Sequence, residues 1–156
     1  DGDATVALPG LQPVPLLGED LDWSWVGTIA EAAGYGEQET GWSGEREFTA
    51  EPIVHLGYDT VTIDGEGKHG VCFGDSGGPL MVIADDGSVR VAGALSGGDG
   101  SCTGWDDFTR VDVYRDWIES YTGPTLPPGP QPCGAVDAMG SCNSQGTIAS
   151  VSIKLS

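Results

Sequence analysis

The chain has 156 residues, of which 24 are acidic and only 6 are lysine or arginine, so its formal net charge at pH 7 is −18. Such a charge repels nucleic acid and anionic membrane surfaces, which argues against both as binding partners. No apolar run approaches the ~20 residues that cross a bilayer, and the 26 glycines and 10 prolines indicate short strands and many turns.

The first half of the chain predicts short strands separated by loops. Residues 1–18 are apolar and broken by prolines, which is typical of one short strand and an extended connection. Residues 23–35 fit either a strand or a short helix, and the acidic, glycine-rich residues 36–52 predict a loop. Residues 53–64 contain β-branched side chains in alternation and predict a strand.

The second half contains a hairpin and a helix. Two apolar runs within residues 79–98 flank Asp86-Gly87, a pair suited to the positive φ angles of a tight turn. Residues 112–121 have helical periodicity, with Asp112 as the predicted N-cap. We interpret its aromatic and apolar stripe as core packing; the stripe consists of Tyr114, Trp117, Ile118 and Tyr121.

Composition divides the chain into three parts. Residues 1–121 are predicted to belong to one domain, residues 122–132 to a proline-rich, semi-rigid linker, and residues 133–156 to a small polar tail with two cysteines. The four cysteines fit an oxidising compartment, and three pairings are possible. No Cys-x-x-Cys or Cys-x-x-His spacing suggests a metal site. Because the first residue is Asp1 rather than methionine, we interpret the chain as a processed or trimmed product.

The stretch "VCFGDSGGPL" (71–80) is the strongest chemical signal in the sequence. Glycines on both sides of Ser76 allow a sharp turn, in which the N–H groups of Gly74 and Ser76 converge on one point and form an oxyanion hole. A glycine-rich turn can contain a serine by chance, but the apolar strand that follows favours a nucleophile. A serine hydroxyl also needs a positioned base, because it is a weak nucleophile without one.

In its order of motifs the chain resembles the C-terminal half of trypsin-like serine proteases, which have the chymotrypsin fold. "GDSGGPL" is followed by the hairpin, "VAGALSGG" (91–98), a cysteine, "FTRV" (108–111) and "DWI" (116–118). Upstream, "GTIAEAAGYG" (27–36) is similar to the strand that opens the second barrel of that family. The resemblance implies an all-β fold: the second barrel of a chymotrypsin-like double β-barrel with a C-terminal helix, followed here by a short tail that carries a disulfide.

The resemblance assigns roles around the nucleophile. Ser76 would be the nucleophile, and Gly74 would contribute to the oxyanion hole. Asp75 would accept the α-amino group that zymogen cleavage creates. The substrate backbone would pair as an added strand with Ser96, Gly97 and Gly98.

The same resemblance describes the pocket for the P1 side chain, the substrate residue before the scissile bond. Gly70 is expected at its floor, six positions before Ser76, and Phe73 along the substrate. A glycine floor favours an apolar P1 side chain. The alternative is Asp106, at the opposite wall, which would either meet a basic P1 group or face water.

Disulfides and departures from the family also concern this pocket. Cys72 and Cys102 match the family disulfide that braces the pocket, which leaves Cys133 to pair with Cys142. Gly97 stands where the family has a tryptophan, and residues 102–108 form a shorter loop than usual.

The base that activates Ser76 is missing from the chain on this reading. The two histidines, His55 and His69, are not in the alanine-alanine-histidine-cysteine context of the family, and we interpret both as surface or loop residues. The segment "DATVAL" (3–8) is similar to the strand that carries the catalytic acid, so Asp3 is the candidate acid. The histidine is then expected on an N-terminal half, either a separate polypeptide or a part that is absent. Because residues 1–71 contain no cysteine, the two halves would associate without a covalent link.

The resemblance implies a secreted or periplasmic serine endopeptidase that acts on polypeptides, needs no cofactor or metal, and depends on a partner half for its histidine. The alternative from another class is a catalytically inactive homologue that acts as a binding module. A third possibility, an anchoring role for the tail, rests only on the Cys133 and Cys142 pair.

Overall fold

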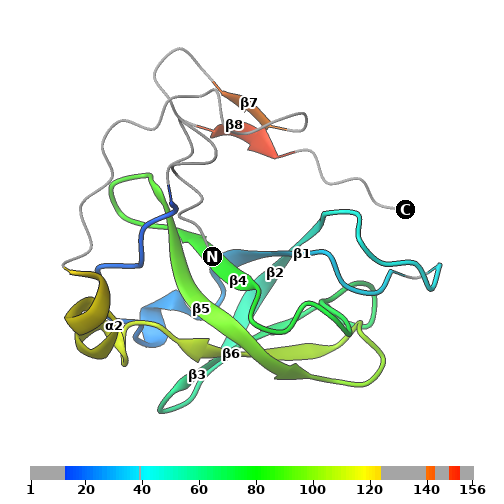
Figure 1. The fold of residues 1–156 in the computed structure, drawn as a ribbon, viewed down its shortest axis with the longest axis horizontal. Helices are drawn as coiled ribbons and strands as arrows, with labels where there is room; N and C mark the ends of the chain where they lie inside the picture. The colour runs from blue at the N-terminus through cyan, green and yellow to red at the C-terminus, as the bar shows by residue number, and fades with distance from the viewer. Residues whose placement is uncertain (1–12, 39, 124–139, 143–147, 152–156) are drawn as a thin grey trace.

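The computed structural model describes residues 13–38, 40–123, 140–142 and 148–151 (Figure 1). Among them, six strands close into an antiparallel barrel in the order β1-β2-β3-β6-β5-β4. These strands are β1 (Ile29–Gly34), β2 (Glu47–Leu56), β3 (Thr60–Asp64), β4 (Pro79–Ile83), β5 (Val89–Gly98) and β6 (Trp105–Arg110). A 3₁₀ helix, η1 (Trp23–Trp25), precedes the barrel and helix α2 (Arg115–Thr122) follows it, while β7 (Gly140–Cys142) pairs with β8 (Ile148–Val151).

The barrel interior follows from the alternation of side chains along each strand, because successive residues of a strand point to opposite faces. Every strand sends buried side chains inward, and Phe108 on β6 is the largest that is fully buried. Pairing of Glu31 with Met81 and of Ala32 with Leu80 joins β1 to β4 and closes the barrel. Two acidic side chains, Glu51 and Asp106, are buried together with the apolar core.

Several expected elements are confirmed, and two are wrong. The single strand predicted for residues 53–64 is instead the end of β2 and the whole of β3, which pair with each other across a turn in which Gly57 N donates to Thr60 O (2.8 Å). The hairpin predicted around Asp86-Gly87 is the β4–β5 hairpin, in which Gly87 has φ +79°. For residues 23–35 the sequence predicted either a strand or a short helix, and the structure contains both: η1 is followed by β1. The predicted loop of residues 36–52 ends earlier than expected, because β2 begins at Glu47, where it pairs with Gly34 of β1. This long-range pairing outweighs the loop-like composition of the segment.

The C-terminal helix differs from the sequence prediction in two ways. Asp112 does not cap it, since α2 begins after Tyr114, and the Asp112 carboxylate instead accepts hydrogen bonds from Leu21 N (2.9 Å) and the Arg110 guanidinium (2.6 Å). The stripe is not core packing either: no residue of α2 is buried, and Trp117 is 64 % exposed. The strands already fill the barrel, so α2 lies outside it (Figure 1).

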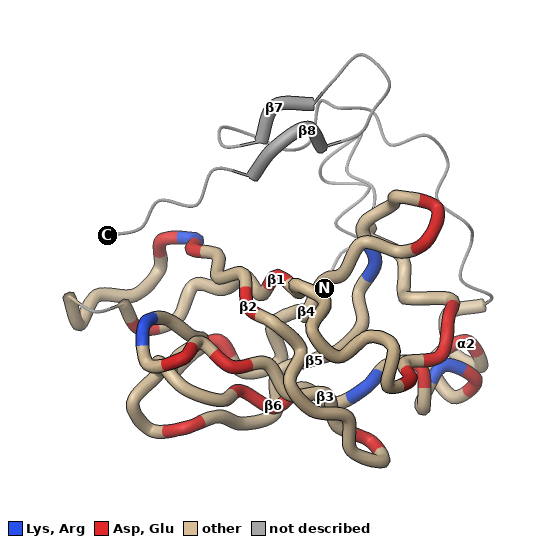
Figure 2. Tube along the Cα trace, turned by 180° about the vertical axis from the view of Figure 1, so that it is seen from behind, with Lys and Arg blue, Asp and Glu red and all other residues tan. Residues whose placement is uncertain are grey.

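Acidic residues extend over the barrel as seen in Figure 2, with few lysines and arginines between them. Among the described residues, no helix has both the length and the apolar character needed to cross a membrane.

Candidate active site

Ser76 lies exposed in a tight turn that leads into β4. Backbone hydrogen bonds fix this turn: Asp75 N donates to Cys72 O (3.1 Å) and Gly78 N donates to Asp75 O (2.7 Å). Gly74 has φ +101°, a conformation that favours glycine, and a Cβ atom there would lie 3.1 Å from Gly36 Cα. The glycines of the motif therefore serve both the backbone conformation and its close packing.

The turn is also tied to β5 and leaves two donors unused. Gly77 N donates to Leu95 O, and Leu95 N donates to Gly78 O, each at 2.9 Å. Within the described part of the chain, neither Gly74 N nor Ser76 N donates a hydrogen bond. These are the two N–H groups that the sequence predicted for an oxyanion hole.

Asp75 turns its side chain away from this exposed surface and toward the loop that follows β1. Its Oδ1 accepts a hydrogen bond from Gly36 N (2.7 Å) and its Oδ2 accepts one from Cys72 N (2.9 Å). A side chain on Gly34 would overlap the Asp75 carboxylate. A carboxylate has about four lone-pair sites, so Asp75 retains acceptor capacity for a further donor. Its role toward an α-amino group stays a prediction.

The P1 pocket predicted from the sequence corresponds to a region where Gly70, Gly98 and Asp106 meet. Asp106 is only 2 % exposed, so the expectation that it faces water is wrong. Its Oδ2 accepts a hydrogen bond from Val71 N (3.1 Å) and lies 3.0 Å from where a Cβ atom of Gly70 would be, and a side chain on Gly98 would overlap its other oxygen. Burial raises the pKa of Asp106 to about 7.

A disulfide braces this region. Cys72 is joined to Cys102, with 4.9 Å between their Cα atoms, which is the pair that the family resemblance implied. The bond ties the start of the Ser76 turn to the loop that precedes β6.

Comparison with known proteins agrees with the fold and with these motifs. The family model described as Trypsin matches residues 24–118, which is more than half of the chain. The chain belongs to the trypsin family.

Curated relatives within this family include chymotrypsin-C of Rattus norvegicus, 47 % identical over 62 residues that make up 37 % of this chain and 23 % of the relative. Brachyurin of Leptuca pugilator is 40 % identical over 65 residues, 42 % of this chain and 28 % of the relative. Phenoloxidase-activating factor 1 of Holotrichia diomphalia is 33 % identical over 116 residues, 64 % of this chain and 32 % of the relative. The chain therefore matches less than a third of the length of each of these three.

A solved structure of human heparin binding protein has the same fold. It is 28 % identical, with a TM-score of 0.56, and the match covers 75 % of this chain and 52 % of that one. This trypsin-family chain thus corresponds to about half of its structural neighbour.

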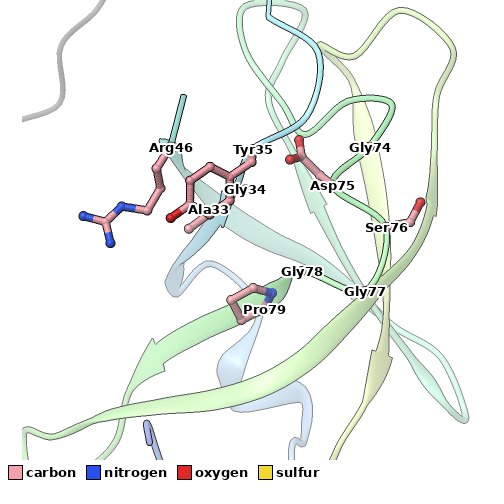
Figure 3. A pocket seen from close by; sticks show the side chains of 10 residues that line it. All are labelled: Ala33, Gly34, Tyr35, Arg46, Gly74, Asp75, Ser76, Gly77, Gly78 and Pro79. Atoms are coloured by element: carbon pink, nitrogen blue, oxygen red, sulfur yellow. The ribbon is translucent and has the colours of Figure 1, made fainter. Parts of the chain in front are cut away.

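A cavity of about 480 Å³ lies beside the Ser76 turn, on the side where β1 meets β4 (Figure 3). Its lining combines the end of β1 with the turn and the start of β4, and consists of Ala33, Gly34, Tyr35, Arg46 and residues 74–79. Figure 3 shows the Ser76 side chain pointing away from Ala33 and Arg46, so the Ser76 hydroxyl does not face these cavity residues.

The end of β5 offers the backbone edge expected for substrate. Ser96, Gly97 and Gly98 are exposed, and on one side they face β6, where Gly97 pairs with Asp107. On the other side, β5 pairs with β4 only as far as Ala94. The next residue, Leu95, forms backbone hydrogen bonds with the Ser76 turn. Phe73 is exposed in the turn itself.

The two histidines have other neighbours than Ser76. His55 is exposed and packs its ring edge-to-face on Trp23, with 5.8 Å between the ring centroids. His69 Nδ1 lies 3.1 Å from Thr49 Oγ1 and 3.3 Å from Glu51 Oε1. In the described chain no hydrogen bond joins either ring to Ser76. The remaining predicted site residues lie outside what is described: Asp3, Cys133 and the side chain of Cys142.

Glu51 is a buried acidic residue close to the predicted pocket floor that the sequence analysis did not single out. It points into the barrel from β2 and has no exposed surface, and burial raises its pKa. Thr49, Glu51 and Ile53 occupy every second position of β2 and therefore share its inner face. This period of two was the sequence signal that could have revealed Glu51 as a buried residue.

Proposed function

We propose that this chain is the C-terminal half of a serine endopeptidase and that Ser76 is its nucleophile. The observation that carries the proposal is the geometry of the turn, which exposes Ser76 and leaves the N–H groups of Gly74 and Ser76 without partners among the described residues. Two N–H donors preorganised at one point stabilise the oxyanion that forms when a carbonyl is attacked.

The reaction is acyl transfer in two steps. Ser76 Oγ attacks the scissile carbonyl while a histidine accepts its proton, and the histidine then donates that proton to the leaving amine. Water next attacks the acyl-enzyme, again with the histidine as base, and releases the carboxylic acid and Ser76. Asp3 is the group proposed to orient the histidine. The mechanism needs no cofactor, and no cluster of three or more histidine, cysteine or acidic side chains suited to a metal is found in the described ranges.

The histidine would come from an N-terminal half that docks against the exposed face of the Ser76 turn, on the side to which the Ser76 hydroxyl points (Figure 3). Phe73, 68 % exposed in the same turn, would be covered by the docked half. The match to only 52 % of the structural neighbour is consistent with a second half of similar size.

Substrate would bind along the β5 edge and in the P1 pocket predicted beside it. A polypeptide would add as a strand along residues 96–98, and its P1 side chain would enter beside Gly70 and Gly98. The burial of Asp106 between these glycines favours the second sequence alternative, a basic P1 side chain, over the apolar one. The disulfide supports export to an oxidising compartment.

A fluorophosphonate probe tests the proposal, because it reacts only with an activated serine. The protein purified without denaturant should contain a second polypeptide that carries the catalytic histidine, and the complex should be labelled at Ser76. Ser76→Ala should abolish labelling. A complete complex that stays unlabelled would favour the inactive binding module.

The inactive alternative is supported by the absence of any bond between Ser76 and a histidine in the described chain. The structural neighbour is a heparin binding protein. Heparin is a polyanion, and a net charge of −18 would repel it, so a binding module built on this chain would take a different ligand.

A further inference from the structure

Two buried carboxyl groups hold the short segment that forms the predicted pocket floor. Glu51 reaches it from β2, with Oε1 3.3 Å from His69 Nδ1, and Asp106 reaches it from β6, with Oδ2 3.1 Å from Val71 N. The floor residue Gly70 lies between these two contacts in sequence. Glu51 has no exposed surface and Asp106 is 2 % exposed, so both are removed from water.

Glu51 lacks a full set of partners. Its Oε1 accepts a hydrogen bond from Thr49 Oγ1 (2.7 Å), but its Oε2 is buried and has no partner in the described residues. A buried carboxylate without donors is unfavourable by several kcal/mol, and accordingly burial, together with the nearby charge of Asp64, raises the pKa of Glu51. The structure therefore contains a buried acceptor that lacks a donor among the described residues.

Glu51 also acts electrostatically on Asp106. Burial is the main cause of the raised pKa of Asp106, and the negative charges of Glu51, Asp99 and Asp107 raise it further. His69 lies within reach of Glu51, and its side chain is 38 % exposed. A negative charge on Glu51 makes ionisation of Asp106 less favourable, and a cation bound to both carboxylates would offset this repulsion.

We propose that Glu51 is a second acidic determinant of the P1 pocket, which together with Asp106 binds the cationic end of a lysine or arginine side chain. This inference rests on the proposed function. In the free protein His69 Nδ1 lies 3.3 Å from Glu51 Oε1. A guanidinium or amidinium has several N–H donors in one plane, so a single group can bond to more than one carboxylate oxygen.

Binding would then be coupled to proton release. Before the cation arrives, Asp106, whose pKa is raised to about 7 by burial, keeps its proton in part of the molecules near neutral pH. When the cation binds, Asp106 ionises and the proton passes to the solvent. A residue with a purely structural role would not change the number of protons released.

Isothermal titration of the full chain with benzamidine, an aromatic amidinium cation, tests this inference without requiring catalysis. Benzamidine should bind and its neutral analogue benzamide should not. Titration between pH 6 and 7 in buffers of different ionisation enthalpy gives the number of protons released. Glu51→Gln should weaken benzamidine binding by about tenfold or more, because a hydrogen bond to a charged group is lost, and should release fewer protons.

Controls separate this role from folding. Glu31 is another glutamate whose pKa is raised by burial, but it lies on the outer face of β1. The control variant Glu31→Gln should therefore bind benzamidine with the affinity of the wild type. Asp106→Asn should lose binding at least as strongly as Glu51→Gln. Thermal unfolding reports whether each variant is folded; if Glu51→Gln is not, Glu51→Asp, which keeps the charge on a shorter side chain, should give intermediate affinity.

The possible outcomes distinguish this inference from the proposed function. Wild-type affinity and proton release in Glu51→Gln would overturn the role of Glu51, and so would a wild-type chain that does not bind benzamidine. If Ser76 of the complete complex is labelled by the fluorophosphonate in either case, the protease proposal stands while this inference falls. Glu51-dependent benzamidine binding without Ser76 labelling would support the cation site and overturn the protease.

Discussion

The Ser76 turn and the pocket floor lie at either end of the segment 70–76, but they are held in different ways. Backbone hydrogen bonds and glycines fix the turn, with Gly78 N bonded to Asp75 O and Gly74 at φ +101°. Side chains of two distant strands fix the floor, through Glu51 and Asp106. Backbone amides do not titrate between pH 4 and 8, whereas buried carboxyl groups do. The site thus combines a turn held mainly by backbone hydrogen bonds with a floor whose buried carboxyl groups respond to pH.

The largest expected effect is on the turn. Gly74→Ala adds a Cβ atom 3.1 Å from Gly36 Cα at a positive φ, which should displace the Gly74 N–H from the oxyanion hole. Loss of one such donor reduces the rate by about 10²–10³-fold, so Ser76 labelling by a fluorophosphonate in the complete complex should slow by that order. Gly87→Ala is the matched control, because Gly87 also has a positive φ but lies in the β4–β5 turn with open space around it. Equal labelling rates in the two variants would show that the Gly74 backbone is not critical.

The second effect concerns the floor and depends on pH. Folded Asp106 keeps its proton up to about pH 7, whereas unfolded Asp106 ionises near its ordinary pKa of 3.8. Between these values the folded state binds the extra proton, so the contribution of Asp106 to the free energy of unfolding falls as pH rises and is constant above the window. The rise in pKa from 3.8 to about 7 sets an upper limit of about 4 kcal/mol.

Asp106→Asn isolates this contribution, because all other titrating groups are the same in the two proteins. Urea denaturation at several pH values gives the free energy of unfolding of variant and wild type. As the pH rises from 4 to 7, the variant should become more stable relative to the wild type. A constant difference would contradict the raised pKa.

The features predicted correctly from the sequence are those with local causes. The Asp86-Gly87 hairpin depends on turn residues next to its own strands. The turn at Ser76 depends on glycines within five positions of Ser76. Neighbouring residues in the chain determine both structures, so a short window of sequence contains the relevant physics.

The features that were missed depend on contacts between distant segments. Asp106 is buried because Gly70 and Gly98 come from other parts of the chain and leave room for its carboxylate. Asp112 is not a cap because Leu21, 91 positions away, donates to its side chain. Trp117 is exposed because strands, rather than the helix, fill the interior. None of these partners can be identified from the window that surrounds each residue.

The Cys72–Cys102 disulfide links the turn to the floor region, and its removal is the third prediction. The bond closes a loop with a sequence separation of 30 residues, so Cys72→Ser with Cys102→Ser should lower the free energy of unfolding by about 2–4 kcal/mol. Thermal unfolding measures this loss, and a reductant should lower the midpoint of the wild type but not that of the double variant. Benzamidine binding should weaken more than oxyanion stabilisation, because the turn retains its own backbone hydrogen bonds. Unchanged benzamidine affinity would show that the floor does not depend on the disulfide.

The smallest expected effect comes from removing the hydrogen bond that Thr49 donates to Glu51 while the packing of the side chain is kept. Thr49→Val keeps the size of the side chain but removes the hydroxyl that donates to Glu51 Oε1 at 2.7 Å. An ionised Glu51 would then lose its closest donor, while a protonated Glu51 loses less, so the variant should be destabilised by about 1 kcal/mol at high pH and by less at pH 5. Loss of the donor should also raise the pKa of Glu51 further, since the bond to Thr49 lowers it in the wild type.

Thr62→Val is the control, because the Thr62 hydroxyl donates to Asp107, which is not a member of the floor. Thermal unfolding at pH 5 and pH 8 decides the matter: an equal loss of stability by Thr49→Val at both pH values would mean that the hydroxyl serves packing alone and that Glu51 does not ionise in the folded protein.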